Sequence, residues 1–129
     1  MLRIIVVALS LALLPAAAFA QDAPVGIKRT PLQKIAFPEG YTVMMGTAEI
    51  PPGGAAGRHT HPGIETGYIL EGEVLMSIDG QPDQMLKAGD SYQIPTGAAH
   101  DVKTVGDKPA KALATYVVEE GKPLASPAK

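Results

Sequence analysis

The chain of 129 residues contains no cysteine and no tryptophan. The absence of cysteine excludes disulfide bonds, thiol nucleophiles and the cysteine ligands of zinc sites. The domain must therefore be stabilised by its core, by a metal ion or by a partner subunit. Aromatic residues make up only 5% of the chain, no run of like charges occurs, and the formal net charge is −2. This balance excludes the basic character that a nucleic-acid partner requires.

No long segment repeats its apolar residues with a helical period. Glycine and proline are numerous, with 14 and 12 residues, which is typical of short strands joined by turns. Segments rich in Val, Ile, Thr and Tyr recur at a spacing of roughly 8–12 residues, the pattern of an all-β sandwich or barrel. Strands are predicted at 41–50, 65–70, 73–78, 91–94, 98–104 and 111–118, and residues 85–88 form a short apolar segment between two turns. The Asp79-Gly80 pair predicts a hairpin with a type I′ turn.

Residues 1–20 have the features of a secretory signal peptide. Arg3 supplies a positive start, an apolar run follows over residues 4–14, and Ala18-Phe19-Ala20 forms a cleavage signal of small residues. The apolar run is shorter than the ~20 residues that a membrane-spanning helix needs. We therefore expect a periplasmic or secreted protein that keeps no stable membrane anchor after cleavage.

The rest of the chain has the size of one domain. Residues 21–37 are expected to form an N-terminal arm, because Pro31 and Pro38 limit any long element there. Residues 38–120 hold the predicted strands. Residues 121–129 show no periodicity and are expected to form a flexible tail.

The chain contains three histidines, His59, His61 and His100. In an extended segment the side chains of His59 and His61 point to the same face, because strand side chains alternate. Glu65 follows after a turn and can bring a carboxylate to the same place, and His100 can complete the group from a later strand. The spacing alone leaves two interpretations open, a shared metal ion or a polar strand edge.

Two motifs resemble the signatures of the cupin family. The first is Gly53-(x)5-His59-x-His61-(x)3-Glu65-(x)6-Gly72, and the second is Gly89-(x)5-Pro95-x-Gly97-(x)2-His100. Thr104 departs from the second signature, where the family usually has Asn. The resemblance implies an all-β, cupin-type jelly-roll β-barrel of about six to eight strands. It also implies that His59, His61, Glu65 and His100 hold one divalent metal ion inside the barrel.

Three imidazoles and one carboxylate suit a divalent transition metal such as Mn, Fe, Co, Ni, Cu or Zn, and they suit calcium poorly. Four protein ligands leave about two positions of an octahedron open, as a catalytic site needs, whereas a closed tetrahedral zinc site is the alternative. We expect the partner to be a small organic ligand or substrate. An enzyme of this kind would be a dioxygenase, an isomerase or a lyase. The alternative is a non-catalytic cupin that binds a small ligand or uses the metal for stability.

Some expectations concern residues outside this ligand set. Residues 28–37 are expected to add a strand to a neighbouring subunit, which would make the protein a homodimer. Arg58 is expected at a solvated rim, and contact with an anionic ligand is the alternative. The core or an interface is expected to hold Tyr68, Tyr92 and Tyr116, and a position in the pocket lining is the alternative.

Overall fold

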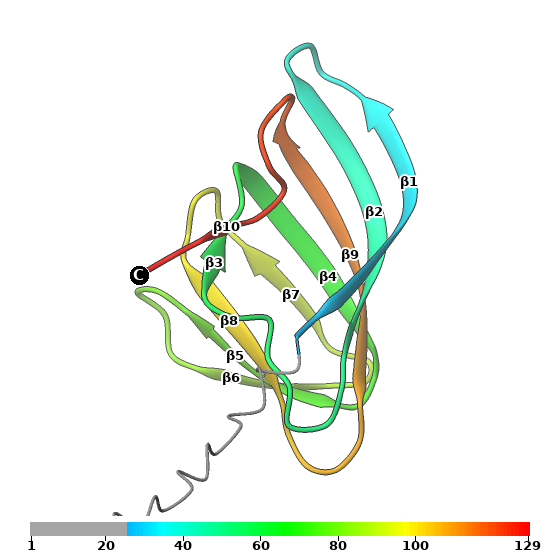
Figure 1. The fold of residues 1–129 in the computed structure, drawn as a ribbon, viewed down its shortest axis with the longest axis vertical. Helices are drawn as coiled ribbons and strands as arrows, with labels where there is room; N and C mark the ends of the chain where they lie inside the picture. Colours follow the sequence, from blue (N-terminus) through cyan, green and yellow to red (C-terminus); the bar gives the residue numbers. More distant parts are fainter. Residues whose placement is uncertain (1–25) are drawn as a thin grey trace, which may run out of the picture.

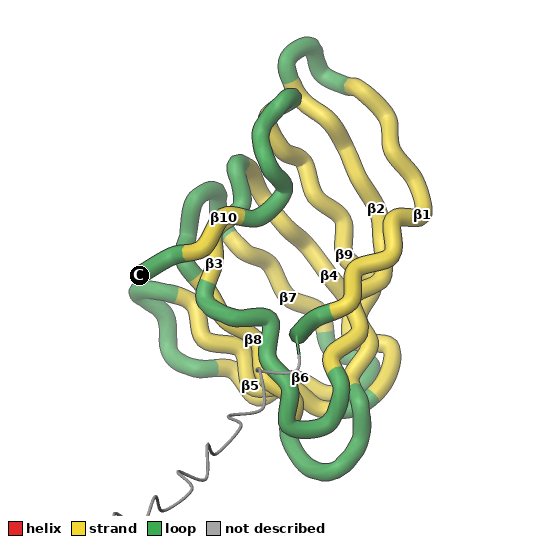
Figure 2. Tube along the Cα trace, in the orientation of Figure 1, coloured by secondary structure: helices red, strands yellow, loops and turns green. Residues whose placement is uncertain are grey.

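The computed structural model describes residues 26–129. The predicted signal peptide (1–20) and the first part of the predicted arm lie outside the described residues. Within 26–129 all regular elements are β-strands (Figure 2). No helix in that part of the chain is therefore long and apolar enough to cross a membrane. The predicted all-β jelly roll is confirmed.

The ten strands of residues 26–129 form two antiparallel five-stranded sheets (Figure 1). In sheet order, the larger sheet contains β1 (Lys28–Ala36), β2 (Tyr41–Ile50), β9 (Ala110–Glu119), β4 (Gly63–Glu71) and β7 (Ser91–Ile94). The smaller sheet contains β10 (Ser126–Pro127), β3 (His59–Thr60), β8 (His100–Thr104), β5 (Glu73–Ile78) and β6 (Gln84–Lys87). The chain passes repeatedly from one sheet to the other, so each sheet is built from segments that are distant in sequence.

The hydrophobic core lies between the two sheets. Alternation in β5 turns Val74, Met76 and Ile78 inward, and each is at most 3% exposed. These side chains pack with Ile69, Leu86, Ile94 and Ala110. A smaller cluster joins Ala114, Tyr116 and Val118 of β9, with Met44 and Leu124 against it. Polar side chains in the space that remains between the sheets must therefore find partners there.

The structure corrects the prediction of an N-terminal arm for residues 28–36. They form β1, which pairs with β2 of the same chain at the edge of the larger sheet. An edge strand tolerates Pro31, and the register shifts between Pro31 and Gln33. Opposite Pro31 lies Gly46, where an added Cβ would come within 2.7 Å of the Thr30 carbonyl oxygen. The close approach that glycine permits at position 46 lets the strand continue past the proline.

The structure corrects the prediction of a flexible tail for residues 121–129. Ser126 and Pro127 pair with Thr60 and His59, so the segment adds a short edge strand to the smaller sheet. The side chain of Leu124 packs against the smaller core cluster. A two-residue strand that pairs with a distant segment has no periodicity of its own, and the sequence therefore offered no signal for it.

The predicted hairpin at Asp79-Gly80 is confirmed as a reversal between β5 and β6. Its predicted turn type is wrong, because no non-glycine residue within 26–129 has a positive φ. Gly80 alone adopts the left-handed region at this reversal, with φ of 76°, and Gln81 donates its N–H to the Ile78 carbonyl at 3.0 Å. The connection runs over residues 79–83 and is longer than a type I′ hairpin allows.

Candidate metal centre

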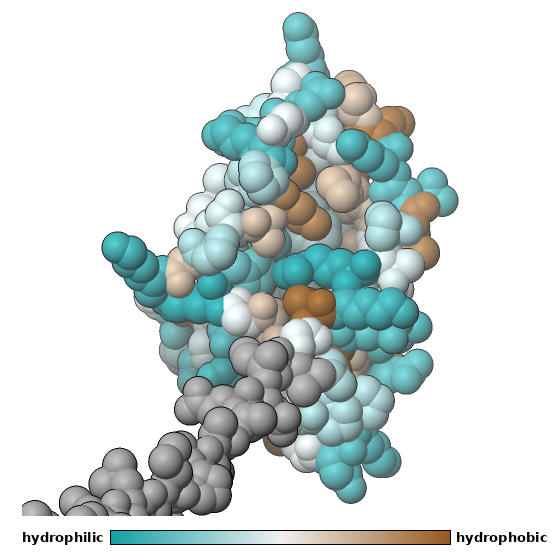
Figure 3. Space-filling view, in the orientation of Figure 1, coloured by the Kyte–Doolittle hydropathy of each residue, from teal (hydrophilic) through white to brown (hydrophobic). Residues whose placement is uncertain are grey.

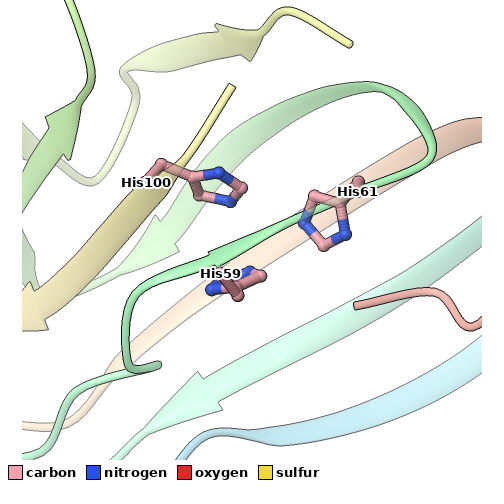
Figure 4. Close-up of side chains that lie close together, drawn as sticks. All are labelled: His59, His61 and His100. Atoms are coloured by element: carbon pink, nitrogen blue, oxygen red, sulfur yellow. The ribbon is translucent and has the colours of Figure 1, made fainter. Parts of the chain in front are cut away.

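The three histidines meet between the sheets. His59 in β3 pairs directly with His100 in β8, and His61 follows in the short connection to β4. One ligand nitrogen from each side chain lies within 4.8 Å of the others. Figure 4 shows the three rings directed at a common space, from two strands and a loop. The period-two prediction for His59 and His61 and the predicted closure by His100 agree with this arrangement.

Backbone carbonyls determine the tautomer of each imidazole. The Nδ1 atoms lie at hydrogen-bond distance from carbonyl oxygens: His59 from Gly57 (2.6 Å), His61 from Leu124 (2.6 Å) and His100 from Ala98 (2.9 Å). A carbonyl oxygen only accepts, so each Nδ1 carries the proton and each Nε2 keeps a free lone pair. This is the arrangement in which a histidine binds a metal through Nε2.

Burial favours the neutral form of His59 and His100. The exposed fractions of His59, His61 and His100 are 7%, 2% and 2%. Desolvation lowers the pKa of His59 to about 4 and lowers the pKa of His100 as well. Neutral imidazoles at physiological pH are the form that binds a cation.

Glu65 reaches the same space from β4 of the larger sheet. Its Oε2 lies 2.8 Å from His61 Nε2 and 3.8 Å from His100 Nε2. The Tyr92 hydroxyl donates to Oε1 at 2.9 Å. Burial by itself raises the pKa of Glu65, but His61, Tyr92 and His100 more than offset this, and the pKa lies below its usual value. The buried side chain is therefore a carboxylate.

The contact between His61 and Glu65 tests whether these residues fit a metal ion. His61 donates through Nδ1, and its Nε2 is buried without a hydrogen-bond partner among residues 26–129 although Glu65 Oε2 lies 2.8 Å away. A nitrogen lone pair and a carboxylate oxygen at this distance need a positive charge between them, either a proton on Nε2 or a metal ion. A metal ion that takes the three Nε2 lone pairs and the carboxylate would satisfy every one of these atoms. The donor set fits a divalent transition metal.

Arg29 is a residue of the site that the sequence analysis missed. It lies in β1, and its Nη2 is 3.2 Å from His59 Nε2. Its Nε is buried and has no hydrogen-bond partner among the described residues. Residues 28–37 were expected to add a strand to a neighbouring subunit, but β1 pairs with β2 of the same chain, and this pairing brings Arg29 to His59.

A small cavity adjoins the histidines. It encloses about 30 Å³, room for about two water molecules. Apolar side chains form most of its wall, among them Ile69, Val74, Met76, Ile94 and Val102. Tyr92 and Tyr116 also line it, and burial raises the pKa of both phenols, that of Tyr116 to about 12. Both tyrosines are therefore neutral.

The remaining residues singled out from the sequence lie outside this group. Arg58 is at the surface, where it forms an ion pair with Asp79 and donates to the Lys129 carbonyl, as expected for a solvated rim. Tyr68 is 48% exposed, so it lies outside the core, and its other expected place, an interface, stays a prediction. Thr104 donates its hydroxyl to the Pro51 carbonyl at 2.9 Å. Its departure from the cupin signature therefore affects a loop contact and leaves the histidines untouched.

Comparison with known proteins gives a family match and several relatives. The family model for the cupin domain matches residues 46–116, more than half of the chain. A germin-like protein of Arabidopsis thaliana, subfamily T member 3, is 32% identical over 104 residues, which cover 75% of this chain and 45% of that protein. The chain spans less than half of the length of the curated relatives that it matches.

Two solved structures have similar folds. DMSP lyase DddQ from Ruegeria pomeroyi DSS-3 has a TM-score of 0.67 and 24% identity, covering 80% of this chain and 52% of that chain. Recombinant oxalate oxidase in complex with glycolate has a TM-score of 0.66 and 27% identity, covering 82% and 57%. The first likeness bears on the fold alone. With the family model matched over both histidine motifs, this chain belongs to the cupin family.

Proposed function

We propose that this protein is an exported cupin that holds one divalent transition-metal ion and binds or transforms a small organic molecule there. The proposed ligands are His59, His61, Glu65 and His100. The observation that carries the proposal is the unpartnered Nε2 of His61, which faces the Glu65 carboxylate at 2.8 Å. Manganese, iron, zinc, copper and nickel all match this donor set.

The metal, when bound, would supply Lewis-acid or redox chemistry to an oxygen-bearing ligand. The chain's own residues have supporting tasks. The backbone carbonyls that accept from the Nδ1 atoms hold the imidazoles in one orientation. Tyr92 holds one oxygen of Glu65, which limits the directions in which the other can point. The apolar wall excludes bulk water, so polar interactions in the cavity are strengthened.

The likeness to an oxalate oxidase that holds glycolate supports an enzyme. Dioxygenase, isomerase and lyase reactions are the candidate activities. The small cavity favours a second candidate, a metal-stabilised or ligand-binding cupin without catalysis, since about 30 Å³ admits very little beside the side chains as they stand. Oxygen uptake with catechols, flavonols and diketones tests the dioxygenase candidate, and chromatographic analysis of the same mixtures for any product tests the isomerase and lyase candidates. A binding protein neither consumes oxygen nor forms a product.

Dimerisation and export are part of the same proposal. β1 lies at the sheet edge and exposes Leu32 and Ile35, which are 51% and 64% accessible, and Phe37 directly after it is 70% accessible. Brown side chains gather at the right-hand margin of Figure 3, where Figure 1 places β1. An open edge with apolar side chains can pair with a second copy. Export rests on the features of residues 1–20.

The decisive experiment measures bound metal after purification of the protein, expressed as the full chain, from the compartment to which it is exported. We expect about one metal ion per chain in the wild type and a large loss in His100→Ala. Lys103→Ala, on the same strand and exposed, is the matched control and should keep its metal. A wild type that carries no more metal than His100→Ala would refute the site.

A further inference from the structure

Arg29 is a half-buried cation without an anionic partner among the described residues. Three charged residues line the cavity beside the histidines, Arg29, Glu65 and Lys111. Glu65 contacts His61 and accepts from Tyr92, and Lys111 pairs with Glu49 at 3.4 Å. Within residues 26–129 no carboxylate lies within ion-pair distance of the Arg29 guanidinium. Its Nε has no hydrogen-bond partner among the described residues, its Nη2 contacts His59, and the guanidinium also interacts with the neutral Tyr116 phenol.

The contact with His59 is incompatible with a metal at the same atom. His59 donates through Nδ1 to the Gly57 carbonyl, so its Nε2 has a single lone pair. Arg29 Nη2 uses that lone pair at 3.2 Å. If a metal ion takes it, the guanidinium must move away from His59, and the like charge of the ion favours that movement.

The surroundings allow such a movement. Arg29 also lines two hollows that are more open than the inner cavity. One encloses about 190 Å³ beside Met44 and Leu124, and the other about 320 Å³ beside Gly57 and Ser126. A guanidinium that swings toward either hollow would vacate space beside the histidines. It would still lie beside the inner cavity, and its N–H groups would still need a hydrogen-bond acceptor.

We propose that Arg29 is the specificity-determining residue of the pocket and that it selects a small carboxylate ligand beside the metal. The proposal rests on the metal site of the proposed function. A guanidinium pairs with a carboxylate through two parallel hydrogen bonds, and such charge-assisted pairs are among the strongest in proteins. The positive charges of a divalent ion and of Arg29 also exceed the single negative charge of Glu65. The site is then positive overall, which disfavours a cationic ligand.

The test compares ligand binding and metal binding in the same variants. Full-length protein is loaded with zinc and titrated calorimetrically with acetate, glycolate and acetamide, the last being a neutral analogue of acetate. Arg29→Met removes the guanidinium, and Arg29→Lys keeps the charge but loses the planar fork. Lys28→Met is the control, because Lys28 precedes Arg29 in β1, is exposed and changes the net charge equally.

We expect the two carboxylates to bind about ten- to a hundredfold more weakly to Arg29→Met than to the wild type, the loss that removal of charged hydrogen bonds causes. The carboxylate affinity of Arg29→Lys should lie between those of the wild type and Arg29→Met, and that of Lys28→Met should match the wild type. Zinc should bind Arg29→Met at least as tightly as the wild type, because the guanidinium no longer competes for His59. A general loss of folding would instead weaken zinc binding.

Two results would overturn the proposal while the metal site stands. One is equal carboxylate affinity in zinc-loaded wild type and Arg29→Met, and the other is acetamide binding as tightly as acetate. Failure of the wild type to take up zinc would refute the proposed function and the role of Arg29 together. The zinc titration and the carboxylate titration therefore report on the two proposals separately.

Discussion

His59 and His100 face each other across neighbouring strands, with ring centroids 4.2 Å apart. Their Cα atoms are direct register partners in β3 and β8, so strand pairing alone brings the two imidazoles together. The carboxylate of Glu65 approaches this pair from the opposite sheet and lies 3.8 Å from His100 Nε2. Whether it joins the histidines as a ligand is the first matter to test.

Glu65→Gln preserves the size of the side chain and removes its charge. If Glu65 is a ligand, we expect metal affinity to fall at least about tenfold, because an amide oxygen is a much weaker partner for a divalent cation than a carboxylate. Competition with a chelator of known affinity measures the change. An affinity equal to that of the wild type would remove Glu65 from the ligand set and leave a site of three histidines.

Tyr92→Phe removes only the hydroxyl that donates to Glu65 Oε1. The carboxylate loses the contact that orients it, and we expect metal affinity to fall about 10- to 100-fold, as is usual for groups that orient a ligand. Tyr68→Phe is the control, because the Tyr68 side chain is 48% exposed. Equal losses in both variants would show that the hydroxyl at position 92 has no specific role.

Removal of residues 124–129 eliminates β10 and the carbonyl that accepts from His61 Nδ1. Metal affinity should fall at least about tenfold, since the His61 ring loses its fixed orientation. Leu124→Ala keeps the carbonyl and loses only packing, so it should retain metal affinity and lose about 1–3 kcal/mol of stability. Chelator competition and chemical denaturation measure the two quantities. Retained affinity in the truncated chain would contradict the role of the segment.

Gly67→Ala tests the packing behind the site. Gly67 in β4 pairs with Tyr92 in β7, and an added Cβ would lie 2.2 Å from the Tyr92 ring. The ring must move, which should cost about 1–3 kcal/mol of stability and weaken its hydrogen bond to Glu65. Gly26→Ala is the control, because a Cβ there meets nothing within 4 Å. Denaturation midpoints that stay equal in the two variants would mean that Tyr92 relaxes without cost.

The histidine cluster could be predicted from the sequence because its geometry is local. His59 and His61 are separated by one residue in an extended segment, so alternation alone directs them together, and the cupin-like motifs added Glu65 and His100. Strands β2, β5 and β7 begin and end where the pattern of β-branched and apolar residues predicted. In each of these cases a short stretch of sequence carries the information.

Arg29 and Leu124 could not be predicted in the same way. Arg29 reaches His59 only because β1 lies along β2 of the same chain past Pro31, whereas this segment was expected to form an arm that adds a strand to a neighbouring subunit. Leu124 contacts His61 through its backbone carbonyl. Every residue type has this carbonyl, so the identity of residue 124 does not indicate the contact. Both contacts depend on long-range strand pairing, which local patterns do not specify.

The hydrogen bond between His61 and Leu124 also sets the order in which the site can form. The two residues are 63 positions apart, so a chain that grows from its N-terminus contains His61 well before it contains the carbonyl partner of that residue. Strand β3 can pair with neither β8 nor β10 until those segments are present. The full set of oriented imidazoles therefore cannot form before Leu124 has been added, and a shorter chain would present His61 to a metal ion without a fixed ring orientation.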